Sequence, residues 1–136
     1  YVVERTMHAL NTHKKAMNGS KILVVGLAYK PDVDDMRESP TFKILDLLKE
    51  KGADIAYYDP YIPVILPTRE HAEWTGLESI SLDDTDLVRS FDAIVISTNH
   101  SSVNYAKLGK LSDCIIDTRN AMKGFDTNKK NIITKA

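Results

Sequence analysis

The sequence predicts an α/β fold: a Rossmann-like, doubly wound, mostly parallel sheet of about five strands with helices on both faces. Apolar runs rich in β-branched residues recur along the chain, stretches of helical periodicity separate them, and polar turn residues mark the boundaries. An uninterrupted apolar run suits a strand buried on both faces, and helical crossovers join such strands in parallel. The length of 136 residues suits one domain.

Local signals place the elements. Ser39-Pro40 marks a helix start, because a Ser hydroxyl can accept from a free backbone N–H and Pro at the first helical position gives up no needed donor. Gly52 marks the end of that helix, since a left-handed cap favours a residue without Cβ. In the first half of the chain we predict a helix over 1–17, a strand over 21–26, a loop over 27–38, the helix that ends at Gly52 and a strand over 53–58. A surface excursion over 60–76 follows, with a helical turn near 69–74, and then a brief strand over 79–82 and a helix carrying Leu87, Val88 and Phe91. The last predicted elements are a strand over 92–97, a helix over 104–111, a strand over 114–117 and an edge strand over 131–134.

Composition and charge exclude several functional classes. Lys and Arg number 18 against 19 Asp and Glu, and this balance argues against binding to nucleic acid or to an anionic membrane. The longest clean apolar run, residues 22–25, is far too short to span a bilayer. The single cysteine excludes an internal disulfide and makes a reducing, cytoplasmic compartment the expectation. The acidic residues lack the spacing of a metal site, so no metal is predicted.

Polar and cationic residues follow the predicted strands. In a parallel sheet, ligands bind outside the carboxyl ends of the strands, so the residues there are candidates for a site. Cations at that edge of a nearly neutral chain indicate an anionic small molecule, most plausibly one with phosphate. The candidates are Gly26 and its loop with Lys30 and Arg37, then Asp59, then Thr98-Asn99-His100, and finally Thr118-Arg119-Asn120.

The usual nucleotide cradles are absent from the sequence. Gly26 is followed by Leu27, Ala28, Tyr29 and Lys30, so the second and third glycines of a dinucleotide fingerprint are missing. An acidic residue that binds a ribose is expected roughly 20 positions further on, and Asp59 lies well beyond that distance. No P-loop pattern occurs either. Standard dinucleotide binding by this chain alone is therefore not expected.

The loop after the first predicted strand carries a resemblance. The stretch Gly26-Leu-Ala-Tyr-Lys-Pro-Asp-Val-Asp-Asp-Met-Arg-Glu-Ser-Pro40 resembles the motif that opens the carboxyl-terminal domain of the UDP-glucose/UDP-N-acetylhexosamine 6-dehydrogenase family. The similarity continues, with order and spacing kept, at residues 49–54, 57–60, 92–96 and 116–120. It implies that residues 1–18 are the end of an inter-domain connecting helix and that residues 19–136 are the UDP-sugar-binding domain.

The resemblance implies a two-step oxidation of the sugar C6 hydroxyl to a carboxylate by NAD, through a thiohemiacetal on a catalytic cysteine. In that family the NAD fingerprint and the cysteine belong to an amino-terminal domain whose motifs are absent from this sequence. Cys114 lacks the expected glycine context, so no catalytic residue is assigned here and the chain alone is expected to be inactive. The expected partners are the NAD-binding domain and, in the full-length protein, a second copy in a homodimer, and the expected role is supply of polysaccharide precursors.

The resemblance also implies roles for single residues. Lys30 would hold a UDP phosphate with Tyr29 beside the nucleotide, Arg119 and Asn120 would bind a phosphate or a uracil carbonyl, and Arg37 would face the cofactor phosphates across the domain cleft. Each role has a plainer alternative: an idle exposed lysine, loop packing, a surface ion pair, or a brace between Arg37 and the preceding aspartates. For His100, a satisfied loop histidine and a ligand contact both remain open.

Three alternatives for the function remain at this point. Tyr29 and the sequence Pro-Asp-Val-Asp-Asp favour the N-acetylhexosamine branch, and UDP-N-acetylglucosamine 6-dehydrogenase in particular, over UDP-glucose 6-dehydrogenase. A stand-alone nucleotide-sugar binding module is the second alternative. A flavodoxin-like or receiver-type signalling domain is the third, but it predicts an acidic pocket after the first strand, where Lys30 and Arg37 stand instead.

Overall fold

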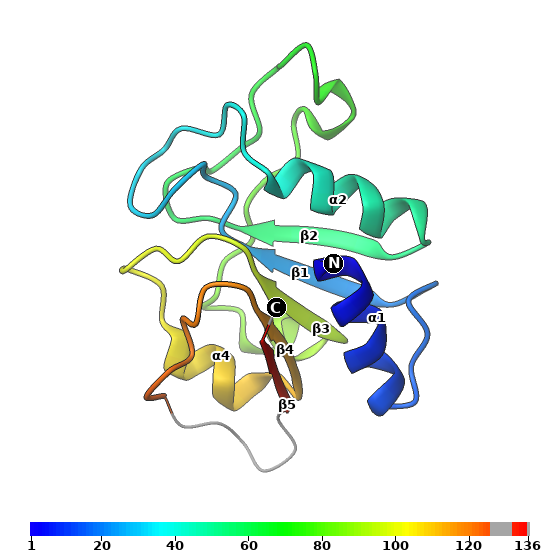
Figure 1. Cartoon of the computed structure of the whole chain (residues 1–136). Coiled ribbons are helices and arrows are strands. Elements are labelled where there is room, and N and C mark those ends of the chain that lie inside the picture. Colours follow the sequence, from blue (N-terminus) through cyan, green and yellow to red (C-terminus); the bar gives the residue numbers. More distant parts are fainter. Residues whose placement is uncertain (126–131, 136) are drawn as a thin grey trace.

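The computed structural model describes residues 1–125 and the backbone of residues 132–135. Its sheet has five parallel strands in the order β2-β1-β3-β4-β5, so the chain winds outward from β1 in both directions. The predicted doubly wound, parallel α/β fold is thereby confirmed (Figure 1). The elements are α1 (Val2–Thr12), β1 (Lys21–Val25), α2 (Thr41–Glu50), β2 (Asp54–Tyr58), the 3-10 helix η1 (Ala72–Trp74), α3 (Thr85–Arg89), β3 (Ala93–Ile96), α4 (Tyr105–Leu111), β4 (Cys114–Asp117) and β5 (Ile132–Lys135).

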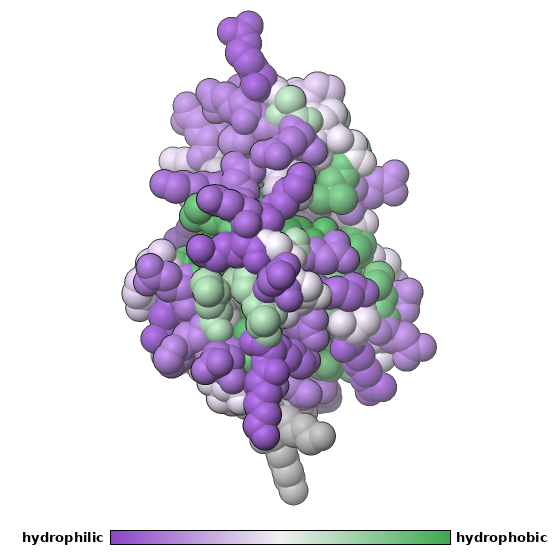
Figure 2. All heavy atoms as spheres, turned by 90° about the vertical axis from the view of Figure 1, so that its right-hand side faces the viewer, coloured by the Kyte–Doolittle hydropathy of each residue, from purple (hydrophilic) through white to green (hydrophobic). Residues whose placement is uncertain are grey.

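Helices cover both faces of the sheet because the strands are apolar on both sides. Ile22 and Val24 of β1 pack into one cluster with α1 and α2, while Leu23 and Val25 pack into a second cluster with α3 and α4. All residues of β3 and β4 are buried, as the uninterrupted apolar runs predicted. Among the described residues, no helix combines the length and the apolar character needed to cross a membrane. The side of the molecule shown in Figure 2 is largely hydrophilic, with apolar atoms in separate small areas.

The first helix is shorter than predicted. It ends at Thr12 rather than near residue 17, because Lys14 adopts a left-handed conformation (φ +60°) and the Lys15 N–H donates to the Leu10 carbonyl (3.0 Å). The apolar residues Val3, Met7, Leu10 and Met17 predicted the helix over 1–17, and Val3, Leu10 and Met17 are buried while Met7 is exposed. The helical spacing was therefore correct for three of these four residues and wrong for the length of the helix.

The brief strand predicted over residues 79–82 is wrong. The chain there makes a single antiparallel bridge, between Val64 and Glu78, and the N–H of Ile80 donates to Tyr57 (2.9 Å) without starting a ladder. Of the three residues that the next helix was predicted to carry, Leu87 and Val88 lie in α3, and Phe91 follows its end and is buried. The predicted edge strand is confirmed as β5, shifted by one residue, although residue 131 lies outside the described residues.

The two ends of α2 match their predicted signals. The Ser39 hydroxyl accepts from the N–H of Thr41 (3.3 Å), the first residue of the helix. At the other end, Gly52 has φ +90°, and the N–H of Ala53 donates to Leu48 (3.1 Å) in the manner of a left-handed cap. Because α2 runs antiparallel to the strands, Ser39 lies at the carboxyl edge of the sheet and Gly52 at the opposite edge.

Candidate functional site

A pocket of about 390 Å³ lies at the carboxyl edge of the sheet, lined by Tyr29, Lys30, Pro31, Pro40, Thr98 and Arg119. Its walls come from the loops after β1, β3 and β4, which gather beyond the arrowheads on the left of Figure 1. From β1 the chain crosses to β2 on one side, and from β3 it crosses to β4 on the other. The loops after β1 and β3 therefore flank the point where the winding reverses, which is where ligands bind in open α/β sheets.

Lys30 and Arg119 line this one pocket although 88 positions separate them in the sequence. The predicted convergence of two cations at one edge is thus confirmed. Lys30 is exposed and forms no ion pair with any described residue. The Arg119 Nε–H donates to the Ser97 carbonyl (3.0 Å), which orients the guanidinium and leaves its two terminal nitrogens without a hydrogen bond to the described residues. The arrangement offers an anion several free donors.

The turn after β4 explains the position of Arg119. The buried carboxylate of Asp117 accepts from the backbone N–H groups of Arg119 (3.1 Å), Ala121 (3.0 Å) and Met122 (2.9 Å). Three bonds to one carboxylate fold the chain back on itself, and Asn120 takes the left-handed conformation (φ +58°) that this turn needs. Asn120 is exposed but does not line the pocket, so the structure does not bring it together with Lys30.

Arg37 lies in a neighbouring hollow. That hollow is lined by Tyr29, Asp35, Arg37 and Glu38, and half-exposed Tyr29 forms the wall between the two spaces. The Arg37 guanidinium holds the Asp35 carboxylate with two bonds, from Nε (3.1 Å) and Nη2 (3.2 Å). These hydrogen bonds lower the pKa of Asp35 and raise that of Arg37. The local brace considered for Arg37 is present, and its contact with a cofactor stays a prediction.

Asp59 occupies the place where a dinucleotide-binding loop would accept a phosphate. Its buried Oδ2 accepts from the N–H groups of Leu27 (2.7 Å) and Ala28 (3.0 Å), and its Oδ1 accepts from the N–H of Tyr61 (2.8 Å). In a Rossmann loop the backbone N–H groups after the first strand face a pyrophosphate. Here a carboxylate of the chain itself uses them, so the described residues do not fit the cradle for the NAD pyrophosphate.

His100 is a satisfied histidine. Its ring is fully buried, Nε2 lies 2.9 Å from Asp59 Oδ2, and Nδ1 accepts from the N–H of Asp32 (2.8 Å). The first of the two alternatives for His100 therefore holds in this structure. The pairing of Asp59 with His100, and a buried hydrogen bond between the Thr41 and Ser97 hydroxyls (2.6 Å), were both missed by sequence reasoning. Small polar residues at strand ends were the available signal, but nothing local says which of them pair.

Cys114 lies in the core rather than at the edge of the sheet. It is a free cysteine in β4, and burial raises its pKa to about 11. A thiol in such surroundings is mostly protonated at neutral pH and is a poor nucleophile. Among the described residues, no group of three or more His, Cys, Asp or Glu side chains is arranged to hold a metal ion.

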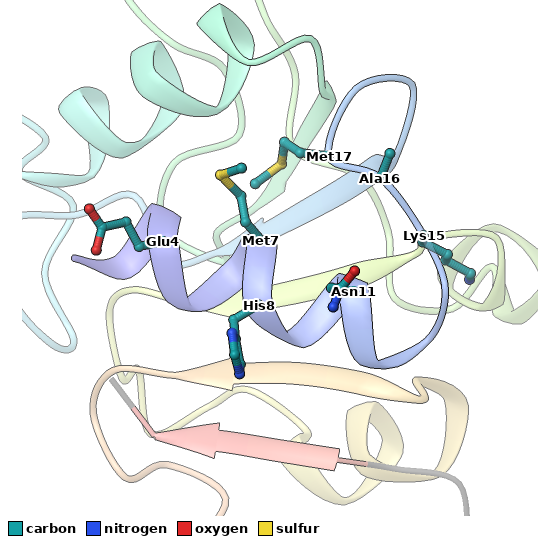
Figure 3. Close-up of a pocket in the computed structure, with 7 residues that line it drawn as sticks. All are labelled: Glu4, Met7, His8, Asn11, Lys15, Ala16 and Met17. Atoms are coloured by element: carbon teal, nitrogen blue, oxygen red, sulfur yellow. The ribbon is translucent and has the colours of Figure 1, made fainter.

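Another open hollow, on a different part of the surface, lies along α1 and the segment after it (Figure 3). Its charged groups are of opposite sign, Glu4 and Lys15, and the Lys15 ammonium already pairs with Asp92 (2.9 Å). The hollow therefore lacks the free cations of the pocket at the strand ends. Its full lining is Glu4, Met7, His8, Asn11, Lys15, Ala16 and Met17.

Comparison with known proteins agrees with this geometry. The sequence model for the UDP-glucose/GDP-mannose dehydrogenase family, UDP binding domain, matches residues 23–124. A UDP-N-acetyl-D-mannosamine dehydrogenase of Pyrococcus horikoshii is 36% identical over 107 residues, which cover 75% of this chain and 22% of that protein. A UDP-glucose 6-dehydrogenase of Bacillus subtilis is 32% identical over 111 residues, which cover 76% and 24%.

A solved structure of a UDP-D-ManNAc dehydrogenase from Pyrococcus horikoshii superposes with a TM-score of 0.73 at 29% identity, covering 98% of this chain and 29% of that one. The chain thus spans less than a third of the length of these relatives. The match includes the loop after β1 and the turn after β4, which carry Lys30 and Arg119. This chain belongs to the UDP-glucose/GDP-mannose dehydrogenase family and corresponds to its UDP-binding domain.

Proposed function

We propose that the pocket between Lys30 and Arg119 binds the diphosphate of a UDP-sugar. The observation that carries the proposal is the convergence of these two cations, neither in an ion pair with a described residue, on one pocket at the reversal point of the sheet. An ammonium can approach phosphate oxygens as a point charge, and the guanidinium can bind two of them side by side. Tyr29 forms one wall against the nucleotide, and Asn120 contributes from the rim beside Arg119.

The oxidation itself requires more than this chain. We propose that the full-length protein oxidises the C6 hydroxyl of the sugar with NAD, and that the nucleophile and the NAD site lie outside residues 1–136. Support comes from the burial of Cys114 and from Asp59, which already uses the N–H groups at the end of β1. Arg37 contributes to NAD binding only when the other domain closes over the neighbouring hollow. The isolated chain is inactive on this proposal.

The sugar we propose is an N-acetylhexosamine. The pattern of residues 29–35 favours that branch, and the relatives include several UDP-N-acetyl-D-mannosamine dehydrogenases. Those relatives favour the manno isomer over the gluco isomer that the sequence alone led us to expect. Residues 1–18 end a connecting helix on this proposal, and the full-length protein is a cytoplasmic homodimer that supplies polysaccharide precursors.

Calorimetric titration of the chain with UDP tests the proposal, with uridine and GDP as controls. We expect saturable binding of UDP that weakens as salt is added, because the contacts are ionic. Uridine, which lacks the phosphates, should bind far more weakly, and GDP should distinguish recognition of uracil from recognition of the diphosphate alone. Equal binding of uridine and UDP, or no binding of UDP, would contradict the assignment of a diphosphate site. Turnover of NAD by the chain with any UDP-sugar would contradict the proposed location of the nucleophile.

A further inference from the structure

We propose that His100 and Asp59 are positioning residues that hold Lys30 in place for the anion. This inference rests on the proposed function, since it gives a reason for a buried polar pair directly beneath the pocket. Both side chains are fully buried, and neither lines the pocket that contains Lys30. They act on the ligand only through the backbone of residues 27–32.

Six residues of the loop are held at both ends by this pair. At the first end, the N–H groups of Leu27 and Ala28 donate to Asp59 Oδ2. At the other end, the N–H of Asp32 donates to His100 Nδ1. Tyr29 and Lys30 lie between these anchors, so the Asp–His unit constrains the backbone that carries Lys30, together with the bond from the Thr98 hydroxyl to the Ala28 carbonyl (2.7 Å).

The hydrogen bonds define which nitrogen of His100 carries the proton. A backbone N–H can only donate, so Nδ1, which receives the Asp32 N–H, must be the unprotonated nitrogen. Nε2 then carries the hydrogen and donates it to Asp59 Oδ2 (2.9 Å). Asp59 orients the ring, and the ring presents a lone pair to Asp32. A carboxylate thus holds one nitrogen of the His100 ring, and the other ring nitrogen accepts a hydrogen bond from the backbone N–H of Asp32.

Further contacts show that the second anchor is under constraint. Asp32 has φ +62°, a left-handed conformation that residues other than Gly, Asn and Asp seldom adopt. Its Oδ1 accepts from both the N–H (2.8 Å) and the hydroxyl (3.0 Å) of Ser101. Residues 100 and 101 thus hold Asp32 by its main chain and by its side chain at once. A loop that only had to connect β1 to α2 would not need this pinning.

Two substitutions of His100 test its bond with the Asp32 N–H separately from its bond with the Asp59 carboxylate. In His100→Asn the amide oxygen can lie near the position of Nδ1 and accept from Asp32, and Asp59 Oδ2 keeps its two backbone donors. In His100→Gln the longer amide can still donate to Asp59, but the Asp32 N–H loses its acceptor. We therefore expect His100→Gln to weaken UDP binding about tenfold and His100→Asn to weaken it less, since displacement of a binding group by about 1 Å is costly.

A double-mutant cycle with Lys30→Ala distinguishes positioning from a general loss of stability. If His100 acts through Lys30, His100→Gln should lower UDP affinity in the wild-type background and change it by less than about twofold beside Lys30→Ala. Leu48→Ala is the matched control, because Leu48 is fully buried near the opposite edge of the sheet. It should lower the melting temperature and leave UDP affinity unchanged.

Equal losses of affinity in both backgrounds, or a loss with Leu48→Ala as large as that with His100→Gln, would overturn the proposal. Hydrogen exchange of the Asp32 amide is a readout that does not depend on UDP. It should be fast in His100→Gln and slow in His100→Asn, and equal rates in the two variants would also overturn the proposal. Normal exchange behaviour together with no effect of Lys30→Ala on UDP binding would instead contradict the proposed function.

Discussion

The loop after β1 consists of two halves that are held by different means. Residues 27–32, which carry Lys30, are fastened to distant parts of the chain through Asp59, Thr98 and His100. Residues 33–38, which carry Arg37, depend for their polar contacts on near neighbours, above all the bidentate bond from Arg37 to Asp35. The first half holds at a defined point a cation, Lys30, that forms no ion pair with the part of the chain that the structure describes. The second half leaves a paired cation with 84% of its side chain exposed.

The two ways of holding the loop indicate that Lys30, rather than Arg37, is prepared to bind a ligand. A cation on a fixed backbone with no partner loses little on meeting an anion, because no ion pair must break first. For Arg37 to bind an anion, its ion pair with Asp35 must break, or the Asp35 carboxylate must stay beside the anion. Lys30 therefore suits a ligand bound by this chain alone, whereas Arg37 suits a contact that forms when a further surface approaches.

The largest expected effect is a loss of stability from a substitution at Gly26, which directly precedes residues 27–32. Gly26 has φ +89°, and a Cβ there would lie 2.4 Å from the Thr98 carbonyl oxygen. Gly26→Ala should therefore cost about 2–5 kcal/mol of unfolding free energy, from backbone strain and from the clash. Gly76→Ala is the matched control, since Gly76 has the same φ with open space around it and should cost only about 1–2 kcal/mol. Equal losses in urea denaturation would show that the approach to Thr98 is not tight.

The next effect sharpens the contrast between the two cations. Lys30→Ala should remove a charge-assisted phosphate contact worth about 1.5–3 kcal/mol, which weakens UDP binding about 10- to 150-fold. Calorimetry would measure this change, with Lys51→Ala as the control because Lys51 is exposed at the opposite edge of the sheet. Unchanged affinity in Lys30→Ala would remove Lys30 from the site.

The pH dependence of hydrogen exchange tests the hydrogen bonds from Ser101 to the Asp32 carboxylate. Hydrogen bonds from the Ser101 N–H and hydroxyl hold the pKa of Asp32 below its ordinary value of 3.8. A carboxyl whose pKa is lowered by folding stabilises the fold while it is ionised, so its contribution is complete above the ordinary value and is lost as the pH falls through the folded-state pKa. Protection of the Ser101 amide from hydrogen exchange should therefore persist above pH 3.8 and decrease only as the pH falls below that ordinary value.

Asp32→Asn is the control for that pH effect. Asn tolerates the left-handed conformation and keeps an oxygen acceptor for Ser101, but it cannot titrate. The decrease in protection at low pH should therefore be absent in this variant. A decrease of the same size in Asp32→Asn would assign it to another carboxyl group.

The smallest effect is expected in the locally held half. Arg37→Ala removes an exposed ion pair, and such pairs contribute little to stability. The melting temperature should fall by less than in Gly76→Ala, and UDP affinity should stay within about twofold. A loss of affinity as large as that of Lys30→Ala would break the comparison, because it would show that both halves of the loop bind the same ligand.

Sequence reasoning succeeded where a local pattern has one structural solution. Uninterrupted apolar runs identified the buried strands β1, β3 and β4, and the rule that parallel strands end at one edge predicted that Lys30 and Arg119 lie together. Sequence reasoning failed at residues 79–82, where the alternating stretch Ser-Ile-Ser-Leu forms no strand ladder. It also extended the first helix past Thr12, since a left-handed lysine was not anticipated at position 14.

Local chemistry by itself determined the order of the elements, the parallel sheet and the edge at which the cations stand, because periodicity, caps and crossover handedness act over short stretches of chain. The pairing of Arg37 with Asp35 is local and was one of the predicted alternatives. Tertiary structure alone decided that the loop carrying Lys30 is held by His100 and Asp59. It also decided that Asp59 joins His100 beneath the loop instead of facing a ribose. Those choices depend on contacts between residues some 40 or more positions apart, such as Asp59 with His100 and Asp32 with Ser101, and no local pattern encodes such pairs.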